Sequence, residues 1–197
     1  MTMPFDAHDD VPDEALLVLF ANGDGAAARV LTLRLTPRVM AHAYRLLGNR
    51  AEAEDVAQEA MLRLWKQAPD WRQGEAKVTT WLYRVVANLC IDRLRRARGG
   101  AVALDAIPEP ADGRASAVEQ LQERARAEAL QAALDTLPER QRQAVVLRHI
   151  EGLANPEIAE IMEITIEAVE SLTSRGKRAL SAALAGRQEE LGYVDER

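Results

Sequence analysis

The chain has 197 residues, 48% of them hydrophobic and 28% charged, a single cysteine and a formal net charge of −6. These values suit a globular protein of one or two small domains, and they exclude a disulfide framework and binding to nucleic acid through bulk positive charge. The first residues carry no basic head before an apolar core, and the longest apolar run, 15–21, is too short to span a membrane, so we expect a cytoplasmic protein.

Helix-forming residues dominate the chain, and strict alternation of Val, Ile and Thr with polar residues is missing, so we predict an all-α fold. Pro37 is expected to break or kink the helix in which it falls. In the first half of the chain, apolar periodicity predicts helices at 13–22, about 26–47, 51–67 and 80–98.

The segment 99–117 contains two prolines and three glycines, which is typical of a flexible linker. We therefore predict two small helical domains, 1–98 and 118–197, on either side of it. The chain up to Arg98 has 14 basic and 13 acidic side chains, whereas the remainder has 11 and 18, so the second domain does not act by being basic. Its predicted helices are 118–135, 138–151, 156–162 and 166–185.

The helix at 51–67 has a polar side that we predict to bind a partner protein. Its apolar core stripe consists of Ala53, Val56, Ala57, Ala60 and Leu64. The other side combines acids with large apolar residues, a mixture that suits protein docking: Asp55, Gln58, Glu59, Leu62 and Trp65. The alternative is a helix buried on both sides with Trp65 in the core, so we prefer the three polar residues as contacts.

The helix at 80–98 concentrates arginines and is expected to bind nucleic acid. Its core stripe consists of Leu82, Val86, Leu89, Cys90 and Leu94, and the opposite face carries Trp81, Arg84, Asn88, Asp92 and Arg95. Arginine neutralises phosphates, asparagine pairs with base edges and an aromatic ring stacks on an unpaired base. The alternative is a solvated face, with Trp81 covering a neighbouring domain.

The segment 155–180 has the signals of a helix-turn-helix. Asn155 is predicted as an N-cap, followed by Pro156 and by Glu157 at the positive helix end, and Thr165 is predicted to cap the second helix. An ordinary helical hairpin is the alternative. The packing positions are Ile158, Ile161, Met162, Ile164, Val169, Leu172, Gly176 and Leu180. The opposite face of the second helix carries Glu167, Ser171, Ser174, Arg175, Lys177 and Arg178. Glu167 and Glu170 would repel phosphate, so this unit alone should hold DNA weakly.

These segments together resemble the sigma-70 family of bacterial RNA polymerase initiation subunits, in its extracytoplasmic-function (ECF) group. AEAEDVAQEAMLRLW resembles region 2.2, TTWLYRVVANLCIDRLRRAR regions 2.3 and 2.4, and the segment 134–180 region 4. An intact region 1.1 or region 3 is not expected in this chain. The resemblance implies two helical domains, regions 2 and 4, joined by the linker.

The resemblance also implies partners and contact residues. Asp55, Gln58, Glu59 and Leu62 would dock on the clamp helices of the polymerase β′ subunit. The −10 promoter element would be bound and opened by the loop 69–77 and the following helix, through Trp71, Gln73, Trp81, Arg84, Asn88, Asp92, Arg93, Arg95 and Arg96. Melting needs a pocket for a flipped base, and the loop is the natural place for it.

Region 4 would recognise the −35 element by placing the helix 166–178 in the major groove, and it would contact the polymerase β flap. The contact residues would be Pro156, Glu157, Thr165, Glu167, Ser171, Ser174, Arg175, Lys177 and Arg178. Three positions depart from the family pattern: Glu163 where glycine is common, Glu170 where Lys or Arg is frequent, and Gly176 where Ala is frequent.

The implied function is initiation of transcription of a stress regulon, under a cognate anti-sigma factor. The chain is similar to the sigma-E-like branch, in which some members have a zinc-binding anti-sigma factor and answer to singlet oxygen. No catalytic set, metal site or cofactor site can be assembled from the residues, so no enzyme is expected. The alternatives are a stand-alone helix-turn-helix regulator and a sigma-mimicking adaptor that binds an anti-sigma factor.

Overall fold

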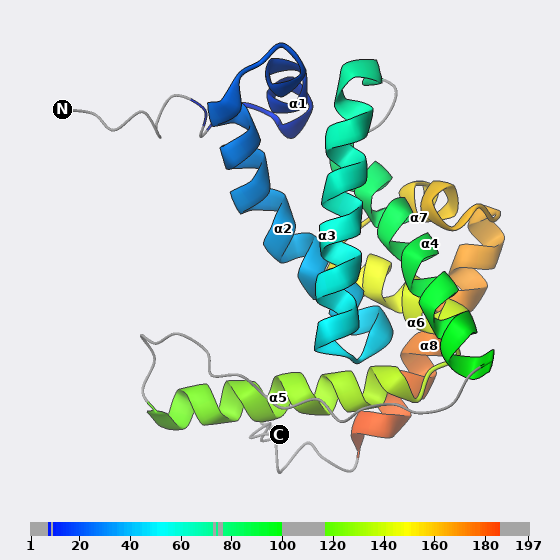
Figure 1. Cartoon of the computed structure of the whole chain (residues 1–197). Helices are drawn as coiled ribbons and strands as arrows, with labels where there is room; N and C mark the ends of the chain where they lie inside the picture. Colours follow the sequence, from blue (N-terminus) through cyan, green and yellow to red (C-terminus); the bar gives the residue numbers. More distant parts are fainter. Residues whose placement is uncertain (1–7, 9, 73, 75–76, 100–116, 186–197) are drawn as a thin grey trace. The chain divides into compact units, whose positions relative to one another are not determined.

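The structure is a computed structural model that describes residues 8, 10–72, 74, 77–99 and 117–185 (Figure 1). Every regular element in these residues is a helix, which confirms the predicted all-α fold. The chain divides into two compact units, one built on helices α1 to α4 and one on α5 to α8. The domain boundaries at 98 and 118 stay a prediction, and residues 100–116 of the predicted linker lie outside the described residues. Within the described part, no helix is both long and apolar enough to cross a membrane.

The first unit contains α1 (Asp13–Ala21), α2 (Gly25–Leu47), α3 (Arg50–Gln67), the 3-10 helix η2 (Ala68–Asp70) and α4 (Val78–Gly99). Each predicted helix is found within two residues of its predicted ends. Of the two predicted effects of Pro37, a break is wrong, because α2 continues through it, and a kink stays a prediction. Proline leaves the carbonyl four residues earlier without its helical donor, and that residue, Leu33, is 61% exposed, where water can serve instead.

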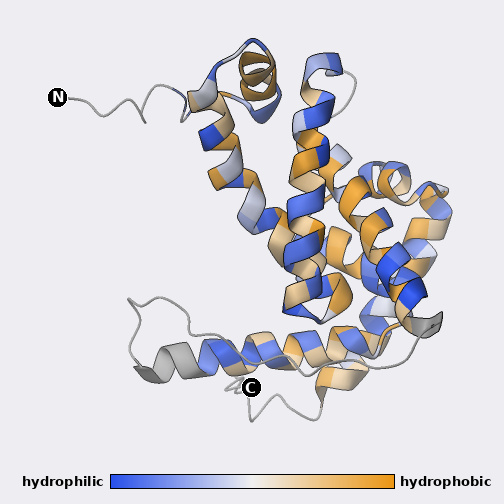
Figure 2. Ribbon diagram, in the orientation of Figure 1, coloured by the Kyte–Doolittle hydropathy of each residue, from blue (hydrophilic) through white to orange (hydrophobic). Residues whose placement is uncertain are grey.

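The core of the first unit consists of small and branched apolar residues that pack between its helices. All five residues of the predicted α3 stripe are buried, and Met61 joins them. The α4 stripe is buried from Leu82 to Cys90, while Leu94 is half-buried. Figure 2 shows hydrophilic residues along the outward side of α3. Burying one large aliphatic side chain stabilises a fold by about 1.5–3 kcal/mol, so this core fixes how α3 and α4 present their outer faces.

The start of α4 is held by α1. The Glu14 carboxylate accepts a hydrogen bond from the backbone N–H of Val78 at 3.0 Å. Arg34 of α2 in turn lies 3.1 Å from the Asp13 carboxylate and donates to the backbone carbonyls of Val11 and His8. The N-terminal turn of α4, which leads into Trp81, is therefore tied to two other helices.

The second unit contains α5 (Ala117–Asp135), α6 (Glu139–Val145), the π-helical turn η3 (Val146–Ile150), α7 (Asn155–Met162) and α8 (Ile166–Leu184). The predicted helix 138–151 thus corresponds to α6 and η3 together. Gly152, with φ of +73°, ends it as a residue that favours the left-handed region. The buried residues of α7 and α8 are the predicted Ile158, Ile161, Met162, Val169 and Gly176.

One predicted cap is displaced. The N-cap of α7 is Ala154, one residue before the predicted Asn155, and the carboxylate of Glu157 accepts from the Ala154 backbone N–H at 2.9 Å. Asn155 is therefore the first helical residue and not the cap, and its side chain donates to the Glu170 carboxylate of α8 at 3.4 Å. Thr165 is the N-cap of α8 as predicted, and its hydroxyl accepts from the Ala168 backbone N–H at 3.3 Å.

The turn between α7 and α8 contains the one described non-glycine residue with positive φ, Glu163, at +53°. This conformation costs an L-residue with a side chain about 1–2 kcal/mol. Glycine loses more chain entropy on folding, which offsets part of the gain. We therefore expect Glu163→Gly to stabilise the second unit by about 0.5–1 kcal/mol. Urea unfolding of the full chain followed by circular dichroism measures this, and an unchanged or lower midpoint would contradict it.

Candidate functional site

The outer face of α4 carries the predicted DNA-binding residues with unequal exposure. Asn88, Asp92 and Arg95 are exposed, and the Arg95 guanidinium lies 3.7 Å from the Asp92 carboxylate. Arg96, one position further, is also exposed. Arg84 is half-buried and its Nε atom is shielded from solvent. The polar and cationic groups most accessible to a nucleic acid therefore lie in the C-terminal half of α4.

Two tryptophans meet where α4 begins. Trp71, just after η2, lies edge-on to Trp81 with ring centroids 6.3 Å apart and an interplanar angle of 87°. The Trp71 Nε1 atom is buried and finds no hydrogen-bond partner among the described residues. A buried N–H without an acceptor is costly, and a base edge or a backbone oxygen of a ligand could accept it. Gln73, predicted beside this pair, lies outside the described residues.

The polar side of α3 is exposed as predicted. Asp55, Gln58 and Leu62 are exposed, with Leu62 at 46%, and Glu59 is half-buried. The Arg63 guanidinium donates to Glu59 at 2.8 Å, and this hydrogen bond holds the pKa of the Glu59 carboxyl below its usual value. The surface therefore presents carboxylates and one large apolar side chain at neutral pH.

An apolar groove of about 450 Å³ runs beside this surface, between α2 and α3. Met40, Met61, Leu62 and Trp65 supply its apolar walls. Trp65 is half-buried and packs edge-on against Phe20, with ring centroids 4.8 Å apart. The groove was not predicted, because Met40 lies on another helix and the pattern of one helix does not show which neighbour it faces.

A second hollow joins the two predicted surfaces of the first unit. Its walls come from Asp55, Gln58, Glu59, Leu62 and Arg63 of α3 and from Leu89, Arg93 and Arg96 of α4. Arg93 lies 2.8 Å from the Glu52 carboxylate, so it ties α4 to α3. The acidic docking surface of α3 and the basic surface of α4 are thus neighbours with a common border.

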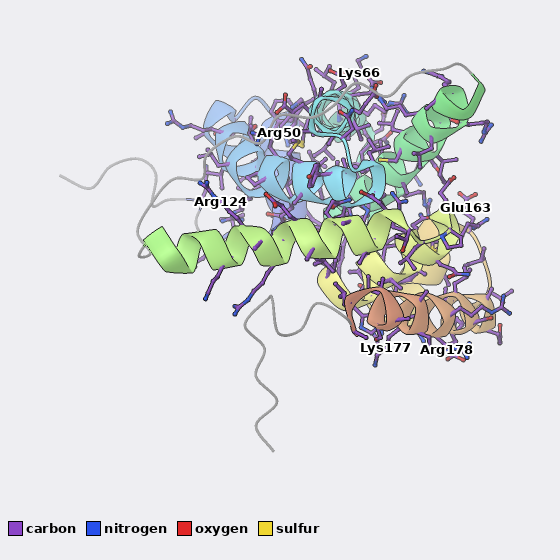
Figure 3. All side chains as sticks on the ribbon, turned by 90° about the horizontal axis from the view of Figure 1, so that it is seen from below. Arg50, Lys66, Arg124, Glu163, Lys177 and Arg178 are labelled. Atoms are coloured by element: carbon purple, nitrogen blue, oxygen red, sulfur yellow. The ribbon has the colours of Figure 1, made fainter. Side chains whose placement is uncertain are left out.

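The exposed face of α8 carries most of the residues predicted to read DNA. Ser174, Arg175, Lys177 and Arg178 are exposed, Ser171 is half-buried, and Lys177 and Arg178 extend outward from the helix (Figure 3). The Glu167 carboxylate is hydrogen-bonded within its own helix end. Hydrogen bonds from its own backbone N–H and then from the Thr165 hydroxyl lower the pKa of its carboxyl. Pro156 is exposed and Glu157 half-buried in the first turn of α7.

Two polar residues on η3, Arg148 and His149, lie near α8 and were not singled out by the sequence analysis. Arg148 and His149 are exposed, and the pKa of His149 is lowered by partial burial and by the positive charges of Lys177 and Arg148. Both residues fall in the predicted helix 138–151, to which the sequence analysis assigned no contact residues. No group of three or more His, Cys, Asp or Glu side chains able to hold a metal occurs in the described ranges.

The second unit contains a helix-turn-helix, and the first presents an acidic surface beside a basic and aromatic one. This combination defines a transcription factor that works with a protein partner. Family models for Sigma-70 region 2 and Sigma-70, region 4 match residues 31–99 and 127–180. The ECF RNA polymerase sigma factor SigW of Bacillus subtilis is 35% identical over 72% of this chain and 80% of its own length. The chain belongs to the sigma-70 family, in its ECF group, and is an initiation factor and not an enzyme.

Other similar proteins support the same family assignment. The ECF RNA polymerase sigma factor SigE of Mycolicibacterium smegmatis is 38% identical over 85% of this chain, which spans 66% of that relative. Among solved structures, CnrH in complex with the cytosolic domain of CnrY has a TM-score of 0.62 and 26% identity, over 88% of this chain and 97% of CnrH. RpoE in complex with the anti-sigma factor NepR from Bartonella quintana has a TM-score of 0.64 over 80% and 96% of the chains and, at 21% identity, shows a common fold.

Proposed function

We propose that this sigma factor acts in the cytoplasm, where it binds core RNA polymerase through α3, recognises −10 and −35 promoter elements and opens the DNA for transcription of a stress regulon. The observation that carries the proposal is the hollow between α3 and α4, where Asp55 and Glu59 lie across from Arg93 and Arg96. A polymerase bound to the acidic wall would have the basic helix directly beside it. Binding of the polymerase and delivery of DNA to α4 then occur on one rigid pair of helices.

Opening of the −10 element is assigned to α4 and the tryptophan pair. Arg95 and Arg96 would neutralise phosphates and Asn88 would contact base edges. Trp71 and Trp81 offer aromatic faces on which unpaired bases can stack, and each stacked base contributes about 1–3 kcal/mol. Unpairing costs a few kcal/mol per base, which stacking of this size can offset.

Each unit is proposed to bind DNA weakly alone. The whole chain carries a net charge of −6, and α8 has Glu167 and Glu170 on its surface. Once the polymerase holds both units, the second DNA contact becomes intramolecular, with an effective concentration that raises the overall affinity by orders of magnitude. This arrangement keeps the free protein off DNA.

Control by an anti-sigma factor is the proposed regulation. One of the similar solved structures holds such a complex, RpoE with the anti-sigma factor NepR, and another holds CnrH with the cytosolic domain of a second protein, CnrY. A partner seated in the apolar groove of Met40, Met61, Leu62 and Trp65 would cover the edge of the polymerase surface. A zinc-binding partner and a response to singlet oxygen stay predictions from the resemblance.

The decisive experiment mixes the purified chain with sigma-free core RNA polymerase. We expect comigration on gel filtration, and permanganate reactivity of unpaired thymines when the complex is given a promoter library. Comigration without permanganate reactivity would favour the sigma-mimicking adaptor. Failure to comigrate would favour the stand-alone helix-turn-helix regulator.

A further inference from the structure

Glu170 is the feature of α8 that phosphate binding does not explain. Its carboxylate is exposed on the helix predicted to enter the major groove, where it would face the negative potential of DNA. An acid in that place lowers affinity for every sequence unless it accepts a hydrogen bond from the DNA. The surroundings of Glu170 and the chemistry of base edges indicate which DNA group donates this hydrogen bond.

One hydrogen bond orients the Glu170 carboxylate. Asn155, in the first turn of α7, donates to a Glu170 oxygen at 3.4 Å, so the carboxylate is held between the two helices of the helix-turn-helix. Asn155 can do this because it is the first helical residue of α7 and not its N-cap. A carboxylate has about four acceptor sites, so one bond from Asn155 leaves the group able to accept more.

The second unusual feature of α8 is an exposed apolar side chain one helical turn before Glu170. Ile166 is the first residue of α8 and is 41% exposed. Residues four apart lie on one side of a helix and about 6 Å apart along its axis. Since base pairs stack about 3.4 Å apart, Ile166 and Glu170 would reach positions about two base pairs apart. The N-terminal residues of a recognition helix are those that touch base edges.

We infer that Ile166 and Glu170 set the sequence preference at the upstream promoter element: Glu170 accepts the N4 amino group of a cytosine, and Ile166 packs on the methyl group of a nearby thymine. In the major groove, cytosine presents an amino donor and thymine a methyl group, and carboxylates and apolar side chains are their matching partners. Asn155 is a positioning residue that orients the carboxylate. The inference rests on the proposed function, because it assumes that α8 reads the −35 element.

The test is selection from a promoter pool with a randomised upstream element, using the full chain assembled with core RNA polymerase. We expect the wild type to enrich cytosine at one position and thymine about two positions away. Glutamine pairs with adenine through N6 and N7, so Glu170→Gln should exchange the cytosine for adenine and shift the ratio of the two bases by at least about tenfold. Ile166→Ala should lower the thymine preference alone, and Asn155→Ala should weaken the cytosine preference without replacing it.

Glu163→Gln is the matched control, because it removes the same charge from the turn before α8 and should leave every base preference unchanged. Enrichment of the same sequences by Glu170→Gln and wild type, with uniformly tighter binding, would overturn the inference and leave Glu170 as a repulsive charge only. No cytosine preference in the wild type would also overturn it. The same selection with the full chain alone at low ionic strength tests the base preference even if polymerase binding, and with it the proposed function, fails.

Discussion

Asp55→Ala is expected to weaken binding to core RNA polymerase by at least about tenfold, and promoter opening by each complex that still forms should be unchanged. Asp55 is exposed and lines the hollow between α3 and α4, so its loss should not disturb the fold. A carboxylate that becomes buried against a positive partner contributes more than one at the rim, because removing it leaves the partner charge unpaired.

Asn88→Ala should show the opposite pattern, with nearly unchanged polymerase affinity and promoter opening reduced by about tenfold, the size expected for one lost base-edge contact. We choose Asn88 over Arg84 because Arg84 is half-buried with a shielded Nε, so its replacement would also disturb α4. Affinity is measured by titration with core polymerase, and opening by permanganate reactivity at saturating factor.

Matched controls come from α5. Glu128→Ala removes an exposed carboxylate and Gln122→Ala an exposed amide, and neither lies in the surfaces assigned to polymerase or DNA. Both should behave as wild type in both assays. Equal losses of affinity and opening in Asp55→Ala and Asn88→Ala would mean that the two surfaces act as one. Arg93→Ala should reduce both activities, because Arg93 pairs with Glu52 and lines the common hollow.

The helices could be predicted because their signals are local. Apolar periodicity located each helix, and a capping side chain such as Thr165 fixed an end. The helix does not break at Pro37, since the cost of a proline depends on whether water reaches the carbonyl that it leaves unpaired, and the sequence does not show that exposure. The cap of α7 lies one residue earlier than predicted, because the Glu157 side chain bonds the backbone N–H of the residue three positions before it, Ala154, as in the N3 half of a capping box.

The surfaces could be predicted singly but not as neighbours. A helical wheel placed Asp55 and Asn88 on outer faces, which the structure confirms as exposed positions. That Asp55 shares a hollow with Arg93, or that Trp71 meets Trp81, depends on how two helices and a loop pack. Such relations arise from long-range contacts, which one sequence without homologues does not reveal. The roles of these residues in binding stay proposals.

Gly176 shows the same limit at atomic scale. The apolar periodicity placed Gly176 on the packing side of α8, but it did not show how closely α6 approaches that side. A Cβ atom at Gly176 would lie 2.5 Å from Val145 Cγ2 and 3.1 Å from the Gln141 backbone oxygen. Neither neighbour can yield easily, because Val145 is 1% exposed and stiff at χ1 and the oxygen belongs to the backbone of α6. Glycine in mid-helix, which costs about 1 kcal/mol relative to alanine, is here the condition for close packing.

Gly176→Val is therefore expected to destabilise the second unit by more than about 2 kcal/mol, and Gly176→Ala by less, because the gain in helix propensity offsets part of the overpacking. All three tryptophans, Trp65, Trp71 and Trp81, lie in the first unit, so tryptophan fluorescence reports that unit, while far-ultraviolet circular dichroism reports both. The urea midpoint should fall by circular dichroism and stay unchanged by fluorescence. Val145→Ala removes the clashing methyl, so its combination with Gly176→Ala should cost less than the sum of the two single changes. Additive losses would show that the close contact with Val145 does not determine the cost.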